Sequence, residues 1–173
     1  MKYPVRILFL VLLLNGMGVF AQSVTIGMTL DEVGKIYPNM KMGTYQKSIT
    51  MERPDMLFGL SGSWGYRFEG DKLNWIFFHK YIDEINAANF RKCLNATQEL
   101  IKEYTLFYGN PDTTMIGDTT FQDPYLEKHW GYDVLEARWN DVRGMKIKVE
   151  FTFMGGKGEY GLLVKIHYFH KNY

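Results

Sequence analysis

The stretch that decides the fold is Met145-Lys146-Ile147-Lys148-Val149-Glu150-Phe151-Thr152-Phe153. Apolar and polar side chains alternate along it, and successive side chains of a β-strand point to opposite faces of a sheet. One face of this strand is therefore expected to be buried and the other to be in water, which is typical of an antiparallel sheet covered on one side. Residues 134–140 and 162–169 alternate in the same way, so the three segments predict a meander of three strands.

A strand pair is predicted further upstream, on either side of the turn residues Gly70-Asp71. Large apolar side chains alternate along both strands and are expected to share one face. They are Trp64, Tyr66 and Phe68 in the first strand and Leu73, Trp75 and Phe77 in the second. Ile76 and Phe78 make the second strand apolar on both faces, which favours a central position or an edge against a second element.

Residues 39–62 show no regular period and contain four methionines together with Pro54 and two loop-forming glycines. Methionine adapts to irregular gaps, so we expect this segment to be an irregular flap that shields the core. A binding loop is the alternative, because long loops without regular structure are often functional. Met51 and Met56 would then be candidate binding residues.

Two helices are predicted. The first begins at Thr29, whose side chain can form a capping box with Glu32, and it ends before Pro38. The second and longest runs from about Asn86 to Tyr108 and ends at Gly109. Its apolar stripe consists of Phe90, Leu94, Thr97, Ile101, Tyr104 and Tyr108, widened by Cys93, Leu100 and Phe107.

The predicted element order is helix, two strands, helix, three strands (α-β-β-α-β-β-β). Runs of strands separated by helices favour an α+β domain with helices packed on one face of an antiparallel β-sheet. We expect residues 22–173 to form a single such domain. Two helix-plus-strands halves, 23–85 and 86–173, are the alternative organisation, and a binding surface could then lie between them.

The composition agrees with one compact globular domain. The chain has 173 residues, of which 46% are hydrophobic and 16% aromatic, with a formal net charge of +1. Disordered and collagen-like chains do not combine so many apolar residues with near-neutrality. Frequent aromatic residues favour β-strands, where rings pack across neighbouring strands.

Residues 1–21 have the pattern of a secretory signal peptide. Lys2 and Arg6 precede the apolar stretch 7–14, and Val19-Phe20-Ala21 places small residues before a cleavage site after Ala21. The apolar stretch is shorter than the roughly 20 residues that span a bilayer, so no stable membrane insertion is expected after cleavage. The mature protein is expected to be periplasmic or secreted.

Cleavage would leave 18 basic and 19 acidic residues, because Lys2 and Arg6 are removed and no acidic residue is. A net charge of −1 provides no global field that would attract nucleic acid. Cys93 is the only cysteine, so no intrachain disulfide can form. Its position on the apolar side of the long helix favours a buried hydrophobic role over a reactive thiol.

The pattern of potentially catalytic residues indicates no enzyme. His167 and His170 are three positions apart, which places them on opposite faces of a strand and makes them unsuitable for one metal ion. No Gly-x-Ser-x-Gly motif occurs. We therefore expect no catalytic residues, no metal site and no cofactor, although carboxylates distant in sequence could still meet in the fold.

The segment 117–133 contains four aromatic residues among polar groups, a composition that is favoured at recognition surfaces. These residues are Phe121, Tyr125, Trp130 and Tyr132. The interpretation that we prefer is that the rings pack over the edge of the sheet. Under the other interpretation the four rings, with Met51 and Met56, form the binding site.

Residues 26–33, Ile-Gly-Met-Thr-Leu-Asp-Glu-Val, resemble the opening helix of two groups of small exported proteins. These are the β-lactamase-inhibitor-like proteins and the outer-membrane assembly lipoproteins of the SmpA/OmlA type. Both carry a Gly-Met-Thr-x-x-Glu-Val-like start and pack helices on an antiparallel sheet. The chain departs from them in lacking a lipidation cysteine and an obvious repeat. The resemblance implies a protein-binding, non-enzymatic role in the cell envelope.

These observations favour an exported, non-enzymatic binding or envelope-assembly module that acts through protein–protein contacts. Its partner would be an unknown protein of the cell envelope or outside the cell. The alternative is a domain that encloses an apolar or sugar ligand between the aromatic face of the sheet and the methionine-rich segment. A third possibility is an uncharacterised enzyme, which would require a cleft with converging titratable groups.

Overall fold

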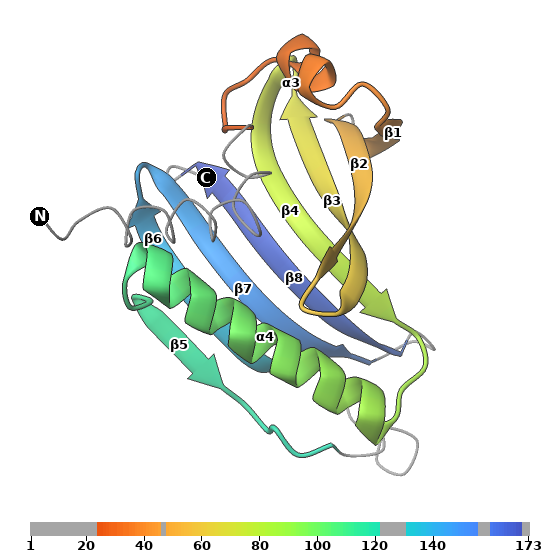
Figure 1. Ribbon diagram of the computed structural model, residues 1–173, viewed down its shortest axis with the longest axis vertical. Coiled ribbons are helices and arrows are strands. Elements are labelled where there is room, and N and C mark those ends of the chain that lie inside the picture. The colour runs from red at the N-terminus through yellow and green to blue at the C-terminus, as the bar shows by residue number, and fades with distance from the viewer. Residues whose placement is uncertain (1–23, 46–47, 122–130, 156–159, 171–173) are drawn as a thin grey trace, which may run out of the picture.

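The computed structural model describes residues 24–45, 48–121, 131–155 and 160–170. They form an α+β fold in which an antiparallel sheet of eight strands is combined with two helices, α3 (Leu30–Ile36) and α4 (Ala87–Tyr108) (Figure 1). The predicted fold class is therefore confirmed. Among the described residues no helix has both the length and the apolar composition needed to cross a membrane.

The eight strands lie side by side in the order β1-β2-β3-β4-β8-β7-β6-β5. Their bounds are Lys41–Tyr45 (β1), Ser48–Leu57 (β2), Leu60–Glu69 (β3), Lys72–Ile82 (β4), Thr113–Ile116 (β5), Tyr132–Val142 (β6), Met145–Met154 (β7) and Gly161–His170 (β8). The order along the chain is α-β-β-β-β-α-β-β-β-β, so the predicted order with two and then three strands is wrong. Each helix is followed by a four-stranded meander, and the two meanders join where β4 pairs with β8.

The segment 39–62, predicted to be an irregular flap, instead forms β1, β2 and the start of β3. The period of β2 is hidden because Arg53 and Asp55 occupy two of its inward positions, where they form an ion pair of 2.9 Å. The Arg53 guanidinium also lies 5.0 Å from the centre of the Tyr37 ring. Pro54 lies beyond Glu52, the last β2 residue paired with β1, so it occupies a stretch with one unpaired edge, where proline is tolerated.

A register shift between β3 and β4 overturns the predicted face of two aromatic side chains. Phe68 pairs with Leu73, whereas Arg67 pairs with Trp75, so β4 has one extra residue at this point. Such a bulge turns the following side chains to the other face of the strand. Leu73 is buried beside Phe68, but Trp75 and Phe77 lie on the opposite face from it.

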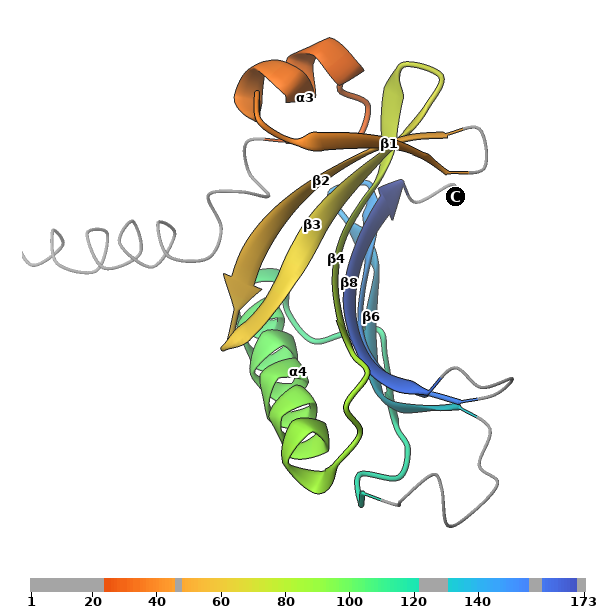
Figure 2. The same cartoon turned by 90° about the vertical axis from the view of Figure 1, so that its right-hand side faces the viewer.

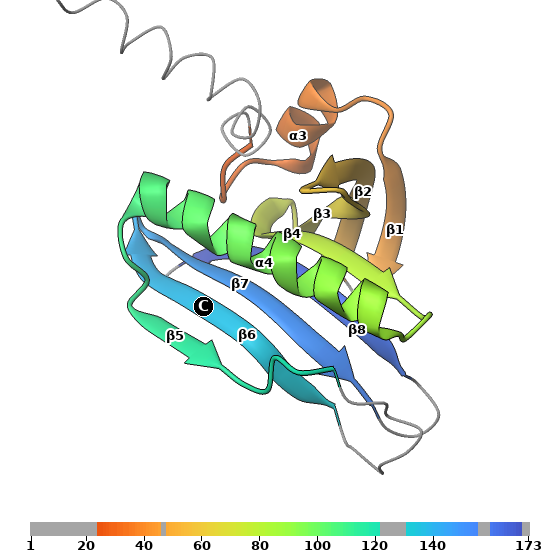
Figure 3. The ribbon, with the colours of Figure 1, turned by 60° about the horizontal axis from the view of Figure 1, so that its bottom comes forward.

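Both helices lie on the same side of the sheet, which we call the inner face (Figure 2). Helix α4 lies over β6, β7 and β8 (Figure 3). The alternation predicted for β7 is confirmed on this side, because Ile147, Val149, Phe151 and Phe153 are all buried.

The helix ends also agree with the sequence pattern, since the capping box at Thr29 and an Asn86 N-cap are both present. The buried stripe of α4 is centred on Cys93, Ala96 and Leu100. Ile101, which was predicted to lie within that stripe, is only partly buried.

The other side of the sheet, which we call the open face, is covered by no described helix. Figure 2 shows β8 bending so that both of its ends turn away from α4, which makes the open face concave along this strand. Side chains on this face come from alternate positions of neighbouring strands, so residues distant in sequence meet there.

Candidate functional site

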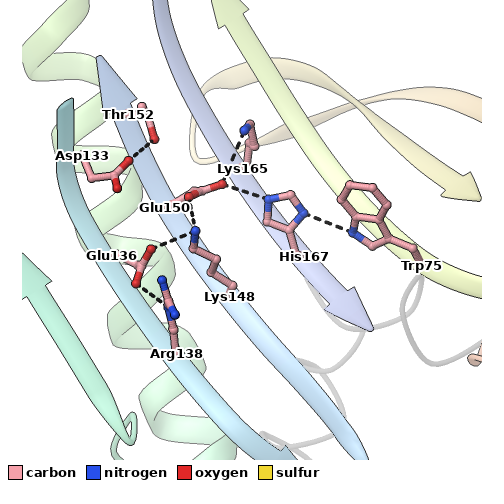
Figure 4. Close-up of polar contacts among 9 residues, drawn as sticks. All are labelled: Trp75, Asp133, Glu136, Arg138, Lys148, Glu150, Thr152, Lys165 and His167. Atoms are coloured by element: carbon pink, nitrogen blue, oxygen red, sulfur yellow. Dashed lines mark hydrogen bonds and ion pairs between the residues drawn. The ribbon is translucent and has the colours of Figure 1, made fainter. Parts of the chain in front are cut away.

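Six charged or titratable side chains form a continuous group on the open face, which we call the charge cluster (Figure 4). They are Glu136 and Arg138 of β6, Lys148 and Glu150 of β7, and Lys165 and His167 of β8. The strand register brings them together, because Glu136 pairs with Glu150 and Glu150 pairs with Lys165.

Like charges lie directly opposite each other in β6 and β7, an arrangement that is unfavourable by itself. Glu136 faces Glu150, and Arg138 faces Lys148. Lys148 bridges the two carboxylates, because its Nζ lies 2.8 Å from Glu136 Oε2 and 2.5 Å from Glu150 Oε2, and Glu136 in turn bridges Lys148 and Arg138. Arg138 Nε donates a second hydrogen bond to Glu136. Opposite charges therefore meet along and diagonally across the strands.

The two carboxylates are buried although they lie on the open face. Glu136 is 6% exposed and Glu150 is 5% exposed. The cations above them are more accessible, with side-chain exposures of 51% for Arg138, 32% for Lys165 and 23% for Lys148. The expectation that all polar side chains of this face are in water is therefore wrong for the carboxylates. The charge that the cluster presents to solvent is positive.

Both carboxylates are held in the ionised form. Burial alone raises the pKa of Glu150, but hydrogen bonds from His167 and Lys148 and the charges of Lys148 and Lys165 outweigh it and lower the pKa to about 2. For Glu136, burial likewise raises the pKa, and the bonds from Arg138 and Lys148 lower it overall. A general acid or base works best with a pKa near the working pH, which does not describe these two groups.

His167 connects the charge cluster to an aromatic side chain of β4. The Trp75 indole Nε1 donates a hydrogen bond of 3.1 Å to His167 Nδ1. Since Nδ1 accepts this bond, the ring proton sits on Nε2, which lies 2.9 Å from Glu150 Oε1 and donates to it. Trp75 therefore fixes both the tautomer and the orientation of the imidazole.

An aromatic strip, which consists of Trp75, Phe77 and His79 of β4 and Phe169 of β8, adjoins the charge cluster. The Trp75 and Phe77 ring centres are 5.1 Å apart, and those of Phe77 and His79 are 5.7 Å apart. Phe77 lies flat against β3, where a Cβ added to Gly65 would come within 2.2 Å of its ring. All four side chains of the strip are partly exposed.

A shallow hollow of about 250 Å³ lies beside the charge cluster on β6, β7 and β8. It is lined by Arg138, Asn140, Lys146, Ile147, Lys148 and Phe169. Three of these six residues are cationic and none is acidic. The hollow is smaller than the 300–1,000 Å³ or so that is usual for sites enclosing a small molecule.

The candidate binding residues named from the sequence do not meet at one place. Phe121 packs on Phe90 at a centre-to-centre distance of 5.7 Å, and Tyr132 stacks on Phe153 at 5.4 Å. Met51 is buried in the core, and Met56 is exposed near the end of β2. Tyr125 and Trp130 lie outside the described residues.

None of those six candidate residues belongs to the charge cluster. The alternation in β7 and β8 indicates that Glu150 and His167 are on the non-helical face, but it does not reveal which residues lie opposite them. That depends on strand register, and for Trp75 also on the bulge in β4.

Two further expectations concern metal ions and the thiol. In the part of the chain that the structure describes, no group of three or more His, Cys, Asp or Glu side chains could hold a metal ion. Cys93 is buried in α4, and this burial raises the pKa of its thiol to about 11. A thiol with that pKa is mostly protonated and weakly nucleophilic at neutral pH.

Comparison with known proteins adds no assignment to this geometry. No protein-family model, no curated protein and no solved structure matches the chain. The resemblance of residues 26–33 to exported envelope proteins therefore stays a prediction. The function has to be argued from the open face.

Proposed function

We propose that the protein is an exported, non-enzymatic binding module that uses the open face of its sheet to contact another protein. The observation that carries this proposal is the aromatic strip lying directly beside an outwardly positive charge cluster. Aromatic residues and arginine are enriched at protein interfaces, where they contribute much of the binding free energy. Trp75, Phe169 and Arg138 are such residues on this face.

The rigidity of these side chains supports a role in recognition. Lys148 is held between Glu136 and Glu150, and His167 is held between Trp75 and Glu150. Side chains that are already ordered lose less conformational entropy when a partner binds. The group is therefore preorganised on a β-sheet scaffold.

The ionisation of the carboxylates also favours binding over catalysis. Glu150 has three positively charged or hydrogen-bonding neighbours and a pKa of about 2, so it neither donates nor accepts a proton near neutral pH. Its effect is to fix Lys148, Lys165 and His167 in place. This is the role of a supporting group beneath a contact surface.

The proposed location follows from the sequence. With the signal peptide 1–21 removed after Ala21, the module would act in the periplasm or outside the cell. The resemblance of residues 26–33 to β-lactamase-inhibitor-like proteins and outer-membrane assembly lipoproteins agrees with a partner in that compartment. We therefore place the partner among proteins of the cell envelope or its surroundings.

Photo-crosslinking in the cells that make the protein tests the proposal. p-Benzoylphenylalanine at position 169 would sit on the open face, and the same group at position 107 would sit on the exposed end of α4 as a matched control. We expect a covalent adduct with another protein from position 169 and none from position 107. Adducts only from position 107, or none from either, would contradict the proposal.

The alternative of an enclosed apolar or sugar ligand has less support from the geometry. Met51 lies in the core and Met56 is exposed, so the methionine-rich segment does not form a wall facing the aromatic strip. Native mass spectrometry of the purified protein distinguishes the two functions. A small molecule retained in a one-to-one complex would favour ligand enclosure.

A further inference from the structure

The hollow beside the charge cluster has a composition suited to an anion. Arg138, Lys146 and Lys148 line it with positive charge, Asn140 adds an amide, and Phe169 forms an apolar part of its wall. We propose that this hollow binds carboxylate side chains of an extended acidic segment in the partner protein. This inference rests on the proposed function, and it specifies the chemistry of the partner.

The charges within the charge cluster do not cancel. Within the charge cluster, the cations Arg138, Lys148 and Lys165 face two carboxylates, Glu136 and Glu150. His167 adds no charge in the tautomer that accepts the Trp75 hydrogen bond. Within the charge cluster one positive charge is therefore in excess.

The acidic groups near the hollow each accept a hydrogen bond or form an ion pair, and Asp112 Oδ2 accepts a hydrogen bond of 2.5 Å from the Asn140 backbone N–H. Glu136 and Glu150 are buried beneath the cations, so the cations lie between these carboxylates and an approaching anion. Asp141, near the end of β6, accepts a hydrogen bond of 3.0 Å from the Gly144 backbone N–H. Asp133 accepts a bond of 2.9 Å from Thr152, near the opposite end of β6.

Arg138 is positioned to receive a carboxylate. Its Nε is bonded to Glu136, while no other described residue engages its terminal guanidinium nitrogens. A guanidinium can present two parallel N–H donors to a carboxylate, which makes arginine effective in this recognition. The Phe169 ring, in the wall of the same hollow, can pack against the methylene groups of a glutamate side chain.

The spacing of the cations favours an extended peptide. Lys146 and Lys148 are two residues apart on β7, which corresponds to about 6.6 Å along a strand. An extended peptide places alternate side chains at the same interval. A segment with an acidic residue at every second position would therefore place successive carboxylates beside Lys146 and Lys148.

Titration of the purified protein with acetyl-(Glu-Ser)4-amide tests this inference, with the same peptide containing Gln in place of Glu as the control. Binding is followed by isothermal calorimetry and by ¹H–¹⁵N NMR. We expect only the acidic peptide to bind and to shift the amide signals of residues 138, 146, 148 and 169.

Variants connect the binding to the hollow. Arg138→Gln and Lys146→Gln should each weaken binding about threefold or more, the effect of losing one accessible ion pair. Lys146→Arg keeps the charge and should restore the affinity. Lys102→Gln removes an exposed lysine of α4, which lies on the inner side of the sheet and is paired with Glu99, and should leave the affinity unchanged. Near-ultraviolet circular dichroism confirms that each variant is folded.

The remaining outcomes overturn the inference. Absence of peptide binding, or binding that Arg138→Gln and Lys146→Gln leave unchanged, excludes the hollow as an acidic-segment site. Binding of a hexagalacturonate oligosaccharide in place of the peptide would assign the hollow to acidic sugars instead. If position 169 crosslinks to a protein while the peptide fails to bind, the open face remains a contact surface and only the acidic partner is excluded.

Discussion

Trp75 and His167, which are 92 residues apart in sequence, are joined by a hydrogen bond between the indole Nε1 and the imidazole Nδ1. Their rings also stack, with centres 5.3 Å apart. This contact crosses the junction between β4 and β8, where the two four-stranded meanders meet. It links the aromatic strip to the charge cluster and makes them one surface.

The Trp75 bond predicts the tautomer of His167. The protein should contain the form protonated at Nε2, which ¹⁵N chemical shifts of the imidazole distinguish from the form protonated at Nδ1. Trp75→Phe removes the donor and should lower the free energy of unfolding by about 1 kcal/mol, the usual contribution of one hydrogen bond. A His167 ring protonated at Nδ1 in the unaltered protein would contradict the structure.

Glu150→Gln should change how stability depends on pH. The folded-state pKa of Glu150 is about 2, below the ordinary value of 4.5. A lowered pKa adds stability that is fully present above pH 4.5 and is lost as the pH falls towards 2. The difference corresponds to at most about 3 kcal/mol.

Urea unfolding between pH 6 and pH 2 measures this effect. The variant should be less stable than the original protein at pH 6, and the gap should narrow below pH 4.5. Glu99→Gln removes an exposed carboxylate of α4 and serves as the control, with a pH profile parallel to the original. A gap of constant size over the whole range would mean that Glu150 is not held in its ionised form.

Neighbouring residues of α4 should differ in their contribution to stability. Leu100 is fully buried, whereas Ile101 is only partly covered. Leu100→Ala should therefore cost about 3 kcal/mol and Ile101→Ala about 1 kcal/mol, because the cost grows with the cavity left behind. Chemical denaturation measures both. Equal losses would show that the helix is rotated relative to the structure.

Gly65 and Phe77 should be energetically coupled. An alanine Cβ at position 65 would lie 2.2 Å from the Phe77 ring, so Gly65→Ala should cost about 1–3 kcal/mol through overpacking. Phe77→Ala removes the obstacle, and the double variant should be more stable than the sum of the single effects predicts. Gly43→Ala, whose Cβ would be 3.3 Å from Thr50 Oγ1, is the milder control. Additive effects would contradict this packing.

The regular parts of the fold could be predicted because their patterns are local. The alternation in β7 identifies a strand with one buried face, and the Thr29 cap identifies the start of a helix. Strand β2 is not evident from the sequence because Arg53 and Asp55 stabilise each other on the inner face and so interrupt the apolar period. Two inward positions that hold an ion pair add no apolar residues to the alternation from which a strand is predicted.

The candidate site was harder to predict, since it depends on register between strands. Lys148 acts as a bridge only because Glu136 of the neighbouring strand lies within 2.8 Å of it. Trp75 reaches His167 only because of the bulge that follows Leu73. Neither relationship follows from the spacing of residues along the chain.

The single pairing of β4 with β8 gives the chain the organisation of a covalently tethered heterodimer. Among the described residues, no other strand pair connects the two meanders, and residues 83–85 carry the chain across to the second helix. Cleavage of the chain within residues 83–85 would convert the β4–β8 pairing from an intramolecular contact into an interface between two fragments. The two fragments would then be expected to reassemble in proportion to their concentration, with the surface formed by Trp75 and His167 completed only on reassembly.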